Sequence, residues 1–267
     1  MPAQVDLYNN AYGHYEAGVY RRIRSFTYGQ DFGQTSWVTN EESNEIPQLL
    51  RITGASPVLE IGCGSGGYAL YLAEQYGCRI TALDINPEGI KNANALADQR
   101  KLRAVCKFQQ CDASKPLPFG DAEFDAVFSN DVLCHIPGRG GVLREVARVL
   151  KAGGKLLFSD ALVIGGMISH EEVATRSSIG YYFFSPPGEN ERLIKEAGLR
   201  LTFARDTTDA AALISKRRHD ARAKRSRELV EVEGEANFDG LQRFLKCVHD
   251  LTSERRLLRF LYLAERA

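Results

Sequence analysis

The sequence has no excess charge of either sign, because its 34 lysines and arginines balance its 34 aspartates and glutamates. A balanced chain gives no electrostatic reason to expect a nucleic acid or a membrane surface as a partner. No run approaches the ~20 apolar residues of a membrane span, and no charged start is followed by an apolar stretch. We therefore expect neither a membrane protein nor a signal peptide, and a cytoplasmic location.

The six cysteines form no C-x-x-C pair, and none has a histidine at zinc-ligand spacing. Several lie inside apolar runs, which is typical of small reduced core residues in a cytosolic protein. The sequence therefore predicts reduced thiols and no metal site. We interpret Cys111 and Cys134 as core or pocket-wall thiols and not as nucleophiles.

In the middle of the chain, residues 57–161, short apolar strands alternate with longer helical segments. This alternation predicts an α/β fold with a doubly wound, Rossmann-like parallel sheet. The glycines of "KAGG" predict a turn into the last of these strands. Strands are expected over 58–61, 79–83, 103–109, 125–129 and 155–159, and helices over 67–76, 86–100 and 142–150.

The second half of the chain contains two further predicted strands, 199–205 and 258–264. Roughly fifty mostly helical residues separate them, which is longer than a usual loop and predicts an inserted cap. Near the N-terminus, tyrosines recur at helical spacing, which predicts a helix that either packs on the core or serves as a lid. The expected organisation is a helical lid over 1–50, a cofactor-binding core over 51–161 and, over 162–267, the rest of the sheet with helical substrate-cap insertions.

The glycine-rich stretch "VLEIGCGSGGYA" fits two nucleotide-binding patterns at once. Gly62, Gly64 and Gly67 fit the dinucleotide pattern G-x-G-x-x-G. Glu60, together with the first two of these glycines and Gly66, fits a different pattern. A glycine turn between a strand and a helix lets the backbone approach a ligand closely, so both patterns predict a nucleotide or nucleoside ligand.

Polar residues follow the next predicted strands. Asp84 ends the second strand, where a carboxylate can accept both hydroxyls of a ribose, in a dinucleotide or an adenosyl ligand alike. Asp112 follows the third strand, where it can accept a hydrogen bond from an adenine amino group. The fourth strand ends in Ser129, Asn130 and Asp131. We interpret Asp131 as a helix cap, with a substrate contact as the alternative.

Taken together, these motifs resemble those of class I S-adenosylmethionine-dependent methyltransferases of the small-molecule type, related to the ubiquinone/menaquinone and sarcosine enzymes. The resemblance covers residues 57–160. It implies a seven-stranded sheet with an antiparallel last strand, S-adenosylmethionine as cofactor, and in-line transfer of a methyl group to an N-, O- or C-atom of a small molecule. It also implies cofactor contacts for Glu60, Gly62, Gly64, Gly66, Asp84, Ile85, Asp112, Ala113 and Asn130 and, by position alone, for Trp37 within the stretch 34–37.

His135 follows the fourth predicted strand closely, which places it at the open edge of the sheet, near the methyl group to be transferred. It is our candidate catalytic residue, because histidine titrates near neutral pH and can take a proton from the acceptor. The alternative is a pocket-wall or cofactor-orienting histidine. For the acceptor we expect aromatic walls, with a plain lid-to-core contact as the alternative. The candidates for these walls are Tyr12, Tyr20, Tyr181 and Tyr182.

Other classes of function stay open at this point. An NAD-dependent oxidoreductase could use the dinucleotide pattern, and a non-catalytic module could bind a cofactor or RNA. An RNA-associated methyltransferase could use the basic run 216–227 as a phosphate-binding face for RNA or a phosphorylated substrate, although such runs are usually solvated helices. We expect a small-molecule partner, no nucleic acid, and a monomer or homodimer.

Overall fold

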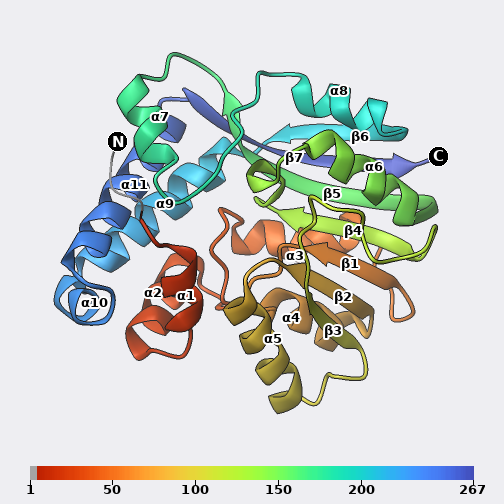
Figure 1. Ribbon diagram of the computed structural model, residues 1–267, viewed down its shortest axis with the longest axis horizontal. Coiled ribbons are helices and arrows are strands. Elements are labelled where there is room, and N and C mark those ends of the chain that lie inside the picture. The colour runs from red at the N-terminus through yellow and green to blue at the C-terminus, as the bar shows by residue number, and fades with distance from the viewer. Residues whose placement is uncertain (1–4) are drawn as a thin grey trace.

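The computed structural model describes residues 5–267, and its strands form a single sheet of seven. The strands are β1 (Pro57–Ile61), β2 (Arg79–Asp84), β3 (Cys106–Gln110), β4 (Phe124–Asn130), β5 (Leu150–Ile164), β6 (Leu199–Asp206) and β7 (Leu257–Arg266). Their order is β3-β2-β1-β4-β5-β7-β6 (Figure 1). Strand β7 runs antiparallel to both of its neighbours, whereas β1 to β5 pair in parallel. The predicted Rossmann-like sheet with an antiparallel last strand is confirmed.

Two helices show the capping residues that commonly mark helix ends, an asparagine N-cap and flanking glycines. The side chain of Asn86 accepts hydrogen bonds from the first-turn N–H groups of the helix that starts at Pro87, as predicted. Gly66 and Gly77 flank the next helix toward the N-terminus. The helices are α1 (Tyr8–Gly13), α2 (Gly18–Tyr28), α3 (Asn40–Leu49), α4 (Gly67–Tyr76), α5 (Pro87–Gln99), the 3₁₀ turn η1 (Leu133–His135), α6 (Arg139–Val149), α7 (His170–Arg176), α8 (Glu189–Glu196), α9 (Thr208–Ala223), α10 (Ser226–Glu233) and α11 (Glu235–Ser253).

Two hydrophobic cores cover the two faces of the sheet. Successive residues of a strand point to opposite faces, so Val58 packs with α3, α4 and α5 while Leu59 packs with α6 and α8. Both side chains are fully buried. This arrangement leaves the carboxyl ends of the parallel strands free to form a site.

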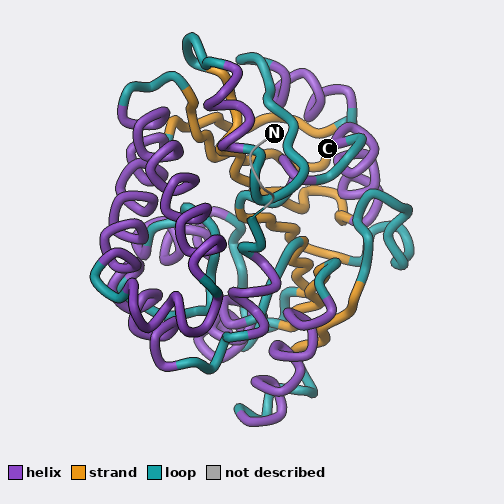
Figure 2. Tube along the Cα trace, turned by 60° about the vertical axis from the view of Figure 1, so that its left-hand side comes forward, coloured by secondary structure: helices purple, strands orange, loops and turns teal. Residues whose placement is uncertain are grey.

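A second group of helices, α1, α2 and α9 to α11, gathers on one side of the sheet (Figures 1 and 2). Helix α1 packs on α5 and α2 packs on α9, so the N-terminal segment contacts both the sheet layer and the late helices. The late helices occupy the long segment between β6 and β7, as the sequence predicts. Within residues 5–267, no helix combines the length and the apolar character needed to cross a membrane.

Two predicted elements differ from the structure. The "KAGG" stretch is not a turn before a strand but lies inside β5, whose pairing with β4 shifts register between Phe124 and Ala126. Gly153 has a φ of 73° there, which an irregular step in a strand requires and glycine adopts without strain. Strand β3 begins at Cys106 and not at residue 103, because the chain turns first: the N–H of Val105 donates to the carbonyl of Leu102.

The basic run 216–227 is not a wholly solvated face. Arg218 and Arg222 are buried between α9 and its neighbours, and the Arg222 guanidinium pairs with the buried carboxylate of Glu233. Lys216 pairs with Asp220 one turn further along α9. Part of the run therefore holds the late helices together.

Candidate functional site

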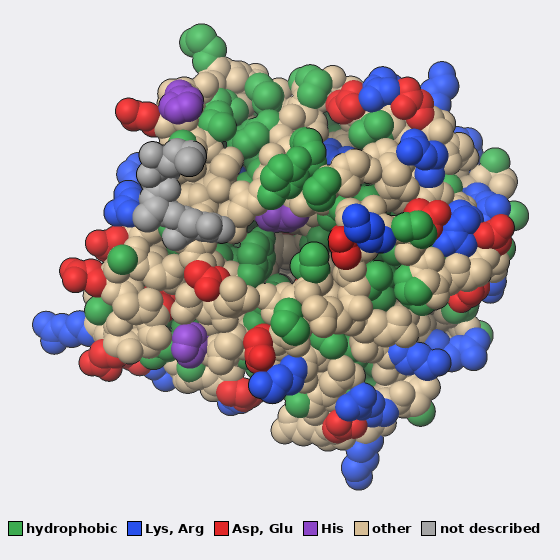
Figure 3. Space-filling model, viewed as in Figure 1, with side chains coloured by type: hydrophobic (Ala, Val, Ile, Leu, Met, Phe, Trp, Pro, Cys, Tyr) green, Lys and Arg blue, Asp and Glu red, His purple; other side chains and the backbone are tan. Residues whose placement is uncertain are grey.

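A cavity of about 340 Å³ opens where β1, β2 and β4 end. This is the edge at which open parallel sheets bind their ligands, and the volume suits a small-molecule site. Figure 3 shows this face of the molecule hollowed, with hydrophobic side chains around the hollow and a histidine side chain in it. Of the residues expected from the sequence, the cavity is lined by Glu60, Gly62, Gly64, Asp84, Ile85, Asn130, His135, Trp37, Tyr12, Tyr181 and Tyr182.

The first two glycines of the loop after β1 form part of the cavity wall. Gly62 and Gly64 have φ values of 83° and 52°, in the region that favours glycine. The N–H groups of Gly62 and Cys63 both donate to the carbonyl of Leu83, which fixes the loop to the end of β2. A Cβ atom on Gly64 would lie 2.8 Å from the hydroxyl oxygen of Tyr12. The loop therefore has room for a ligand but not for side chains.

The last two glycines of the loop lie outside the cavity wall. A Cβ atom on Gly66 would meet Phe108 and Ala93, and one on Gly67 would meet the carbonyl of Phe32. Both glycines are buried, and both permit close packing of α4. The structure gives Gly66 a packing role, and its expected cofactor contact stays a prediction.

Two polar side chains at the glycine-loop end of the cavity have oxygen atoms without hydrogen-bond partners among the described residues. Glu60 is buried, and one of its carboxylate oxygens has no hydrogen-bond partner among the described residues; the same holds for the side-chain oxygen of Asn130. Burial, followed by the nearby Asp84, raises the pKa of Glu60 to about 8. Asp84 accepts N–H bonds from Gly64 at 2.7 Å and Asn86 at 2.8 Å, which counteract the rise in its pKa caused by burial. Buried unpartnered oxygens are costly, so this end is built for a ligand with hydrogen-bond donors.

Three predicted site residues lie elsewhere. Tyr20 donates its hydroxyl hydrogen to Glu233 in a cluster of α2 and α10, outside the cavity, so its expected place in the acceptor wall is wrong. Asp112 is exposed and accepts a hydrogen bond from the N–H of Ser114, also outside the cavity. Ala113 is buried in the core under α6. For the last two, a contact with adenine stays a prediction.

His135 lies at the other end of the cavity, in the 3₁₀ turn after β4, and its ring hydrogen bonds define its tautomer. Nδ1 lies 3.2 Å from the carbonyl oxygen of Tyr181, which can only accept, so Nδ1 carries the proton. Nε2 then accepts the hydroxyl hydrogen of Tyr8 at 3.0 Å. Burial, followed by the positive charge of Arg176, lowers the pKa of His135 to about 4. The imidazole is therefore neutral at pH 7, with its basic nitrogen toward Tyr8.

Sequence reasoning placed Tyr8 only among the N-terminal tyrosines of the expected lid, and it did not select Arg176. Both line the cavity. The only early signal for Tyr8 is its position one helical turn before Tyr12. Nothing in the sequence around Arg176 distinguishes it from the chain's other arginines.

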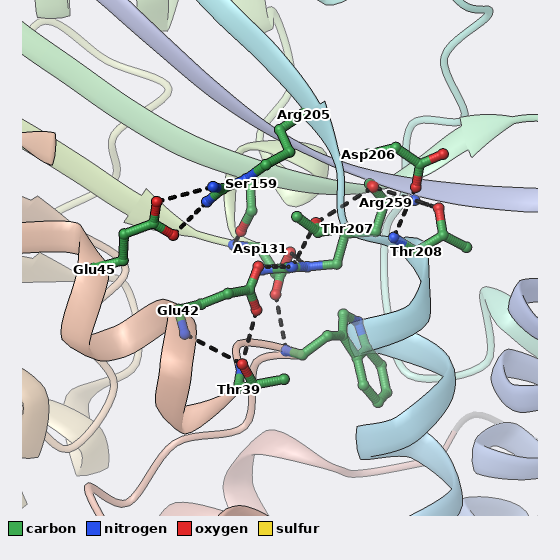
Figure 4. Close-up of polar contacts among 11 residues, drawn as sticks. Thr39, Glu42, Glu45, Asp131, Ser159, Arg205, Asp206, Thr207, Thr208 and Arg259 are labelled. Carbon is green, nitrogen blue, oxygen red and sulfur yellow. Dashed lines mark hydrogen bonds and ion pairs between the residues drawn. The ribbon is translucent and has the colours of Figure 1, made fainter.

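Asp131 is not a helix cap: it fastens the loop before α3 to the sheet (Figure 4). One of its carboxylate oxygens accepts the N–H of Trp37 at 2.8 Å, and the other accepts from Arg259 Nε at 2.9 Å. Arg259 in β7 also donates to Glu42 of α3 at 2.7 Å. We call Asp131, Arg259 and Glu42 the clamp. It holds the backbone of Trp37, whose side chain lines the cavity, as was expected of this stretch.

Comparison with known proteins identifies the middle of the chain. Residues 59–158 match the family model described as "Methyltransferase domain". Residues 59–158 are a methyltransferase domain. The match confirms the methyltransferase assignment that the resemblance predicts, and nothing in it supports an NAD-dependent oxidoreductase.

The methyltransferase domain has relatives of several kinds. The chain is 28% identical to a phosphoethanolamine N-methyltransferase of Triticum aestivum over 80% of its own length, and spans 41% of that relative. It is 36% identical to a sarcosine/dimethylglycine N-methyltransferase of Halorhodospira halochloris over 40% of its length and 38% of the relative's. The chain thus spans less than half of these relatives.

The fold has solved counterparts. A phosphoethanolamine N-methyltransferase 2 of Haemonchus contortus, in complex with phosphomonomethylethanolamine and S-adenosylhomocysteine, aligns with a TM-score of 0.80. The sequence identity is 19%, and the alignment covers 97% of this chain and 59% of that one. At this identity the likeness shows the fold alone.

The residues around the glycine loop fit S-adenosylmethionine. The unpartnered oxygens of Glu60 and Asn130 suit its ammonium group, and Asp84 suits its ribose hydroxyls. The exposed side chain of Ile85 at the cavity wall suits the flat face of adenine. In the methyltransferase domain, these residues would hold the cofactor, which supplies an activated methyl group on a sulfonium.

Proposed function

We propose that this chain transfers the methyl group of S-adenosylmethionine to a nitrogen or oxygen atom of a small molecule, with His135 as the proton acceptor. The observation that carries the proposal is that a single cavity has a cofactor-type end and, opposite it, an end with a proton acceptor. One end has the glycine loop and the unpartnered Glu60, and the other has a neutral imidazole with its basic Nε2 inward.

The protein's part in such a reaction is alignment, exclusion of water and removal of a proton. Tyr8 and Tyr12 from α1 and Trp37 from the clamped loop cover the cavity. An acceptor whose N–H or O–H replaces the Tyr8 hydroxyl at Nε2 would donate its proton there. Burial lowers the pKa of His135 to about 4, so Nε2 is unprotonated at neutral pH but is a weaker base than an ordinary imidazole.

The proposal is tested by incubating the protein with methyl-labelled S-adenosylmethionine and a panel of small amines, phenols and alcohols. Transfer of label to any of them, with release of S-adenosylhomocysteine, supports it. Cofactor binding without transfer across the whole panel would contradict catalysis and favour a cofactor-binding module. The lid over 1–50, the substrate-cap role of 162–267 and the monomer or homodimer remain parts of the proposal.

Replacing His135 with glutamine should lower kcat by about 10² to 10⁴-fold, because the proton acceptor is lost. Binding of S-adenosylmethionine, measured by calorimetry, should not change, since the glycine loop is at the other end of the cavity. Tyr8→Phe is the matched variant: it removes only the hydroxyl that contacts Nε2. Unchanged turnover in His135→Gln would leave this histidine a pocket-wall residue.

Binding of S-adenosylmethionine should be coupled to a proton through Glu60. Burial raises the pKa of this carboxyl to about 8, so it is mostly protonated at pH 7. A cofactor ammonium beside it would favour the charged form and release the proton. We therefore expect affinity to rise between pH 6 and about 7.5, by up to tenfold per unit, below the range where an α-amino group itself titrates.

The control for this prediction is Glu60→Gln, which keeps the shape of the side chain and cannot titrate. Calorimetry of wild type and variant over the same pH range gives the two slopes. A slope in the variant as steep as in wild type would assign the proton to another group.

A further inference from the structure

Arg176, the last residue of α7, is a buried cation without a counter-charge. It is 1% exposed and lines the cavity. Its Nε and Nη1 atoms have no hydrogen-bond partner, and it forms no ion pair with any carboxylate in residues 5–267. Burying an unpaired charge lowers the stability of the folded state. Stability alone therefore does not explain an arginine at this position.

Most of the other buried arginines have carboxylate partners; Arg218 has none among residues 5–267 and contacts the carbonyl oxygen of Thr35 at 3.4 Å. Arg139 pairs with Asp160, and Arg222 pairs with Glu233. Arg259 pairs with two carboxylates in the clamp. These three side chains hold secondary-structure elements together. Arg176 differs from them in facing the cavity, where a partner could come from outside the protein.

Three aromatic rings surround the guanidinium. Its central carbon lies 4.4 Å from the ring centre of Tyr182, 5.2 Å from Phe244 and 5.9 Å from Trp37. Such rings stabilise a cation through their faces, but they cannot take the place of an anion at the N–H groups. The rings therefore hold the guanidinium in place, while the N–H groups at Nε and Nη1 have no partner among residues 5–267.

We propose that Arg176 binds an anionic group, a carboxylate or a phosphate, on the methyl acceptor. This inference rests on the proposed function and names the class of acceptor. The ring of Tyr182 lies against Arg176 and also 4.3 Å from the ring of His135. An acceptor anchored at Arg176 would thus have its reacting atom near Nε2. Asp84 lines the glycine-loop end, and its carboxylate would repel the anion from the cofactor's place.

The bound anion would also change the basicity of His135. The groups that face this imidazole are Tyr8 from α1, Arg176 from α7, Tyr182, and Asp131 at the end of β4. Arg176 is one cause of the low pKa of His135, so an anion paired with it raises that pKa. The acid limb of kcat should therefore lie at higher pH than that of kcat/KM, which reports the free enzyme.

The test uses acetate and inorganic phosphate as probes, with acetamide as the neutral analogue of acetate. Binding is followed by calorimetry and by the emission of Trp37, the only tryptophan in the chain. We expect saturable binding of at least one anion and none of acetamide. Arg176→Met should lose about 10- to 100-fold in anion affinity, because charge-assisted hydrogen bonds are removed. Arg176→Lys, which keeps the charge, should retain part of it.

The control is Arg243→Met, which removes an exposed arginine next to Phe244 in α11 and should bind anions as wild type does. Preference for phosphate or for acetate identifies the kind of anionic group. If neither binds while S-adenosylmethionine does, or if Arg176→Met binds anions like wild type, the anion site is wrong and the proposed function stands. Failure of S-adenosylmethionine to bind, with anion binding intact, would instead contradict the proposed function.

Discussion

Replacing Gly64 with valine should abolish detectable binding of S-adenosylmethionine. The residue has a φ of 52°, which a β-branched side chain adopts only with strain. Its Cβ would lie 2.8 Å from the Tyr12 hydroxyl oxygen and 3.2 Å from two carbons of the same ring, beside the cavity. The expected measurement is calorimetry of the folded variant, with an affinity loss of at least about 100-fold, from steric exclusion of the ligand.

A second glycine variant distinguishes loss of affinity caused by backbone strain from loss caused by steric exclusion of the cofactor. Gly198 also has a positive φ, 79°, but nothing lies within 4 Å of the place its Cβ would take, and it lies outside the cavity. Gly198→Val should therefore lose stability and keep its affinity for S-adenosylmethionine. Wild-type affinity in Gly64→Val would show that the cofactor does not approach this loop.

Replacing Arg259 with methionine should destabilise the fold by about 3–5 kcal/mol, the cost typical of breaking a buried ion pair by removing one partner. Arg259 is 0% exposed, and its partners Asp131 and Glu42 are 4% and 12% exposed at their side chains. Without the cation, two carboxylates would face each other in a dry environment. Urea unfolding measures the loss, and the emission of Trp37 reports whether its loop has moved.

A neighbouring pair in Figure 4 provides the comparison. Arg205 binds Glu45 on the same side of α3, but their side chains are 41% and 40% exposed. Arg205→Met should therefore cost at most ~1 kcal/mol, because exposed pairs are screened by water. Equal losses in the two variants would mean that the clamp contributes no more than a surface ion pair.

Local signals in the sequence were sufficient for much of the sheet. Helix α4 has the predicted bounds, because a glycine at each end interrupts an otherwise apolar helical pattern. The length of β5 was not predictable in the same way. Its glycines suggest a turn, but pairing with β4 continues on both sides of them, at Leu150 and Lys155, so the strand runs through this irregular step. Tertiary pairing overrides local propensity at that point.

In the candidate site, too, residues placed by local motifs were predictable, and residues placed by tertiary packing were not. Glu60, Gly62 and Asp84 belong to short motifs in which the strand end fixes the position of the side chain, so spacing alone predicted their place. The contact between Tyr8 and His135 joins residues 127 positions apart. Tyr20 shares the tyrosine pattern with Tyr12 but belongs to a separate helix that faces α10. Such placements depend on how helices pack, which periodicity does not specify.

Helix α1 has a consequence for the order of events in a catalytic cycle. One short helix carries both Tyr12, which lies on the glycine loop, and Tyr8, which contacts the basic nitrogen of His135. A displacement of α1 would therefore uncover both ends of the cavity together. In the proposed reaction, loading of the methyl donor and discharge of its spent form would then be tied to the movement that admits the acceptor.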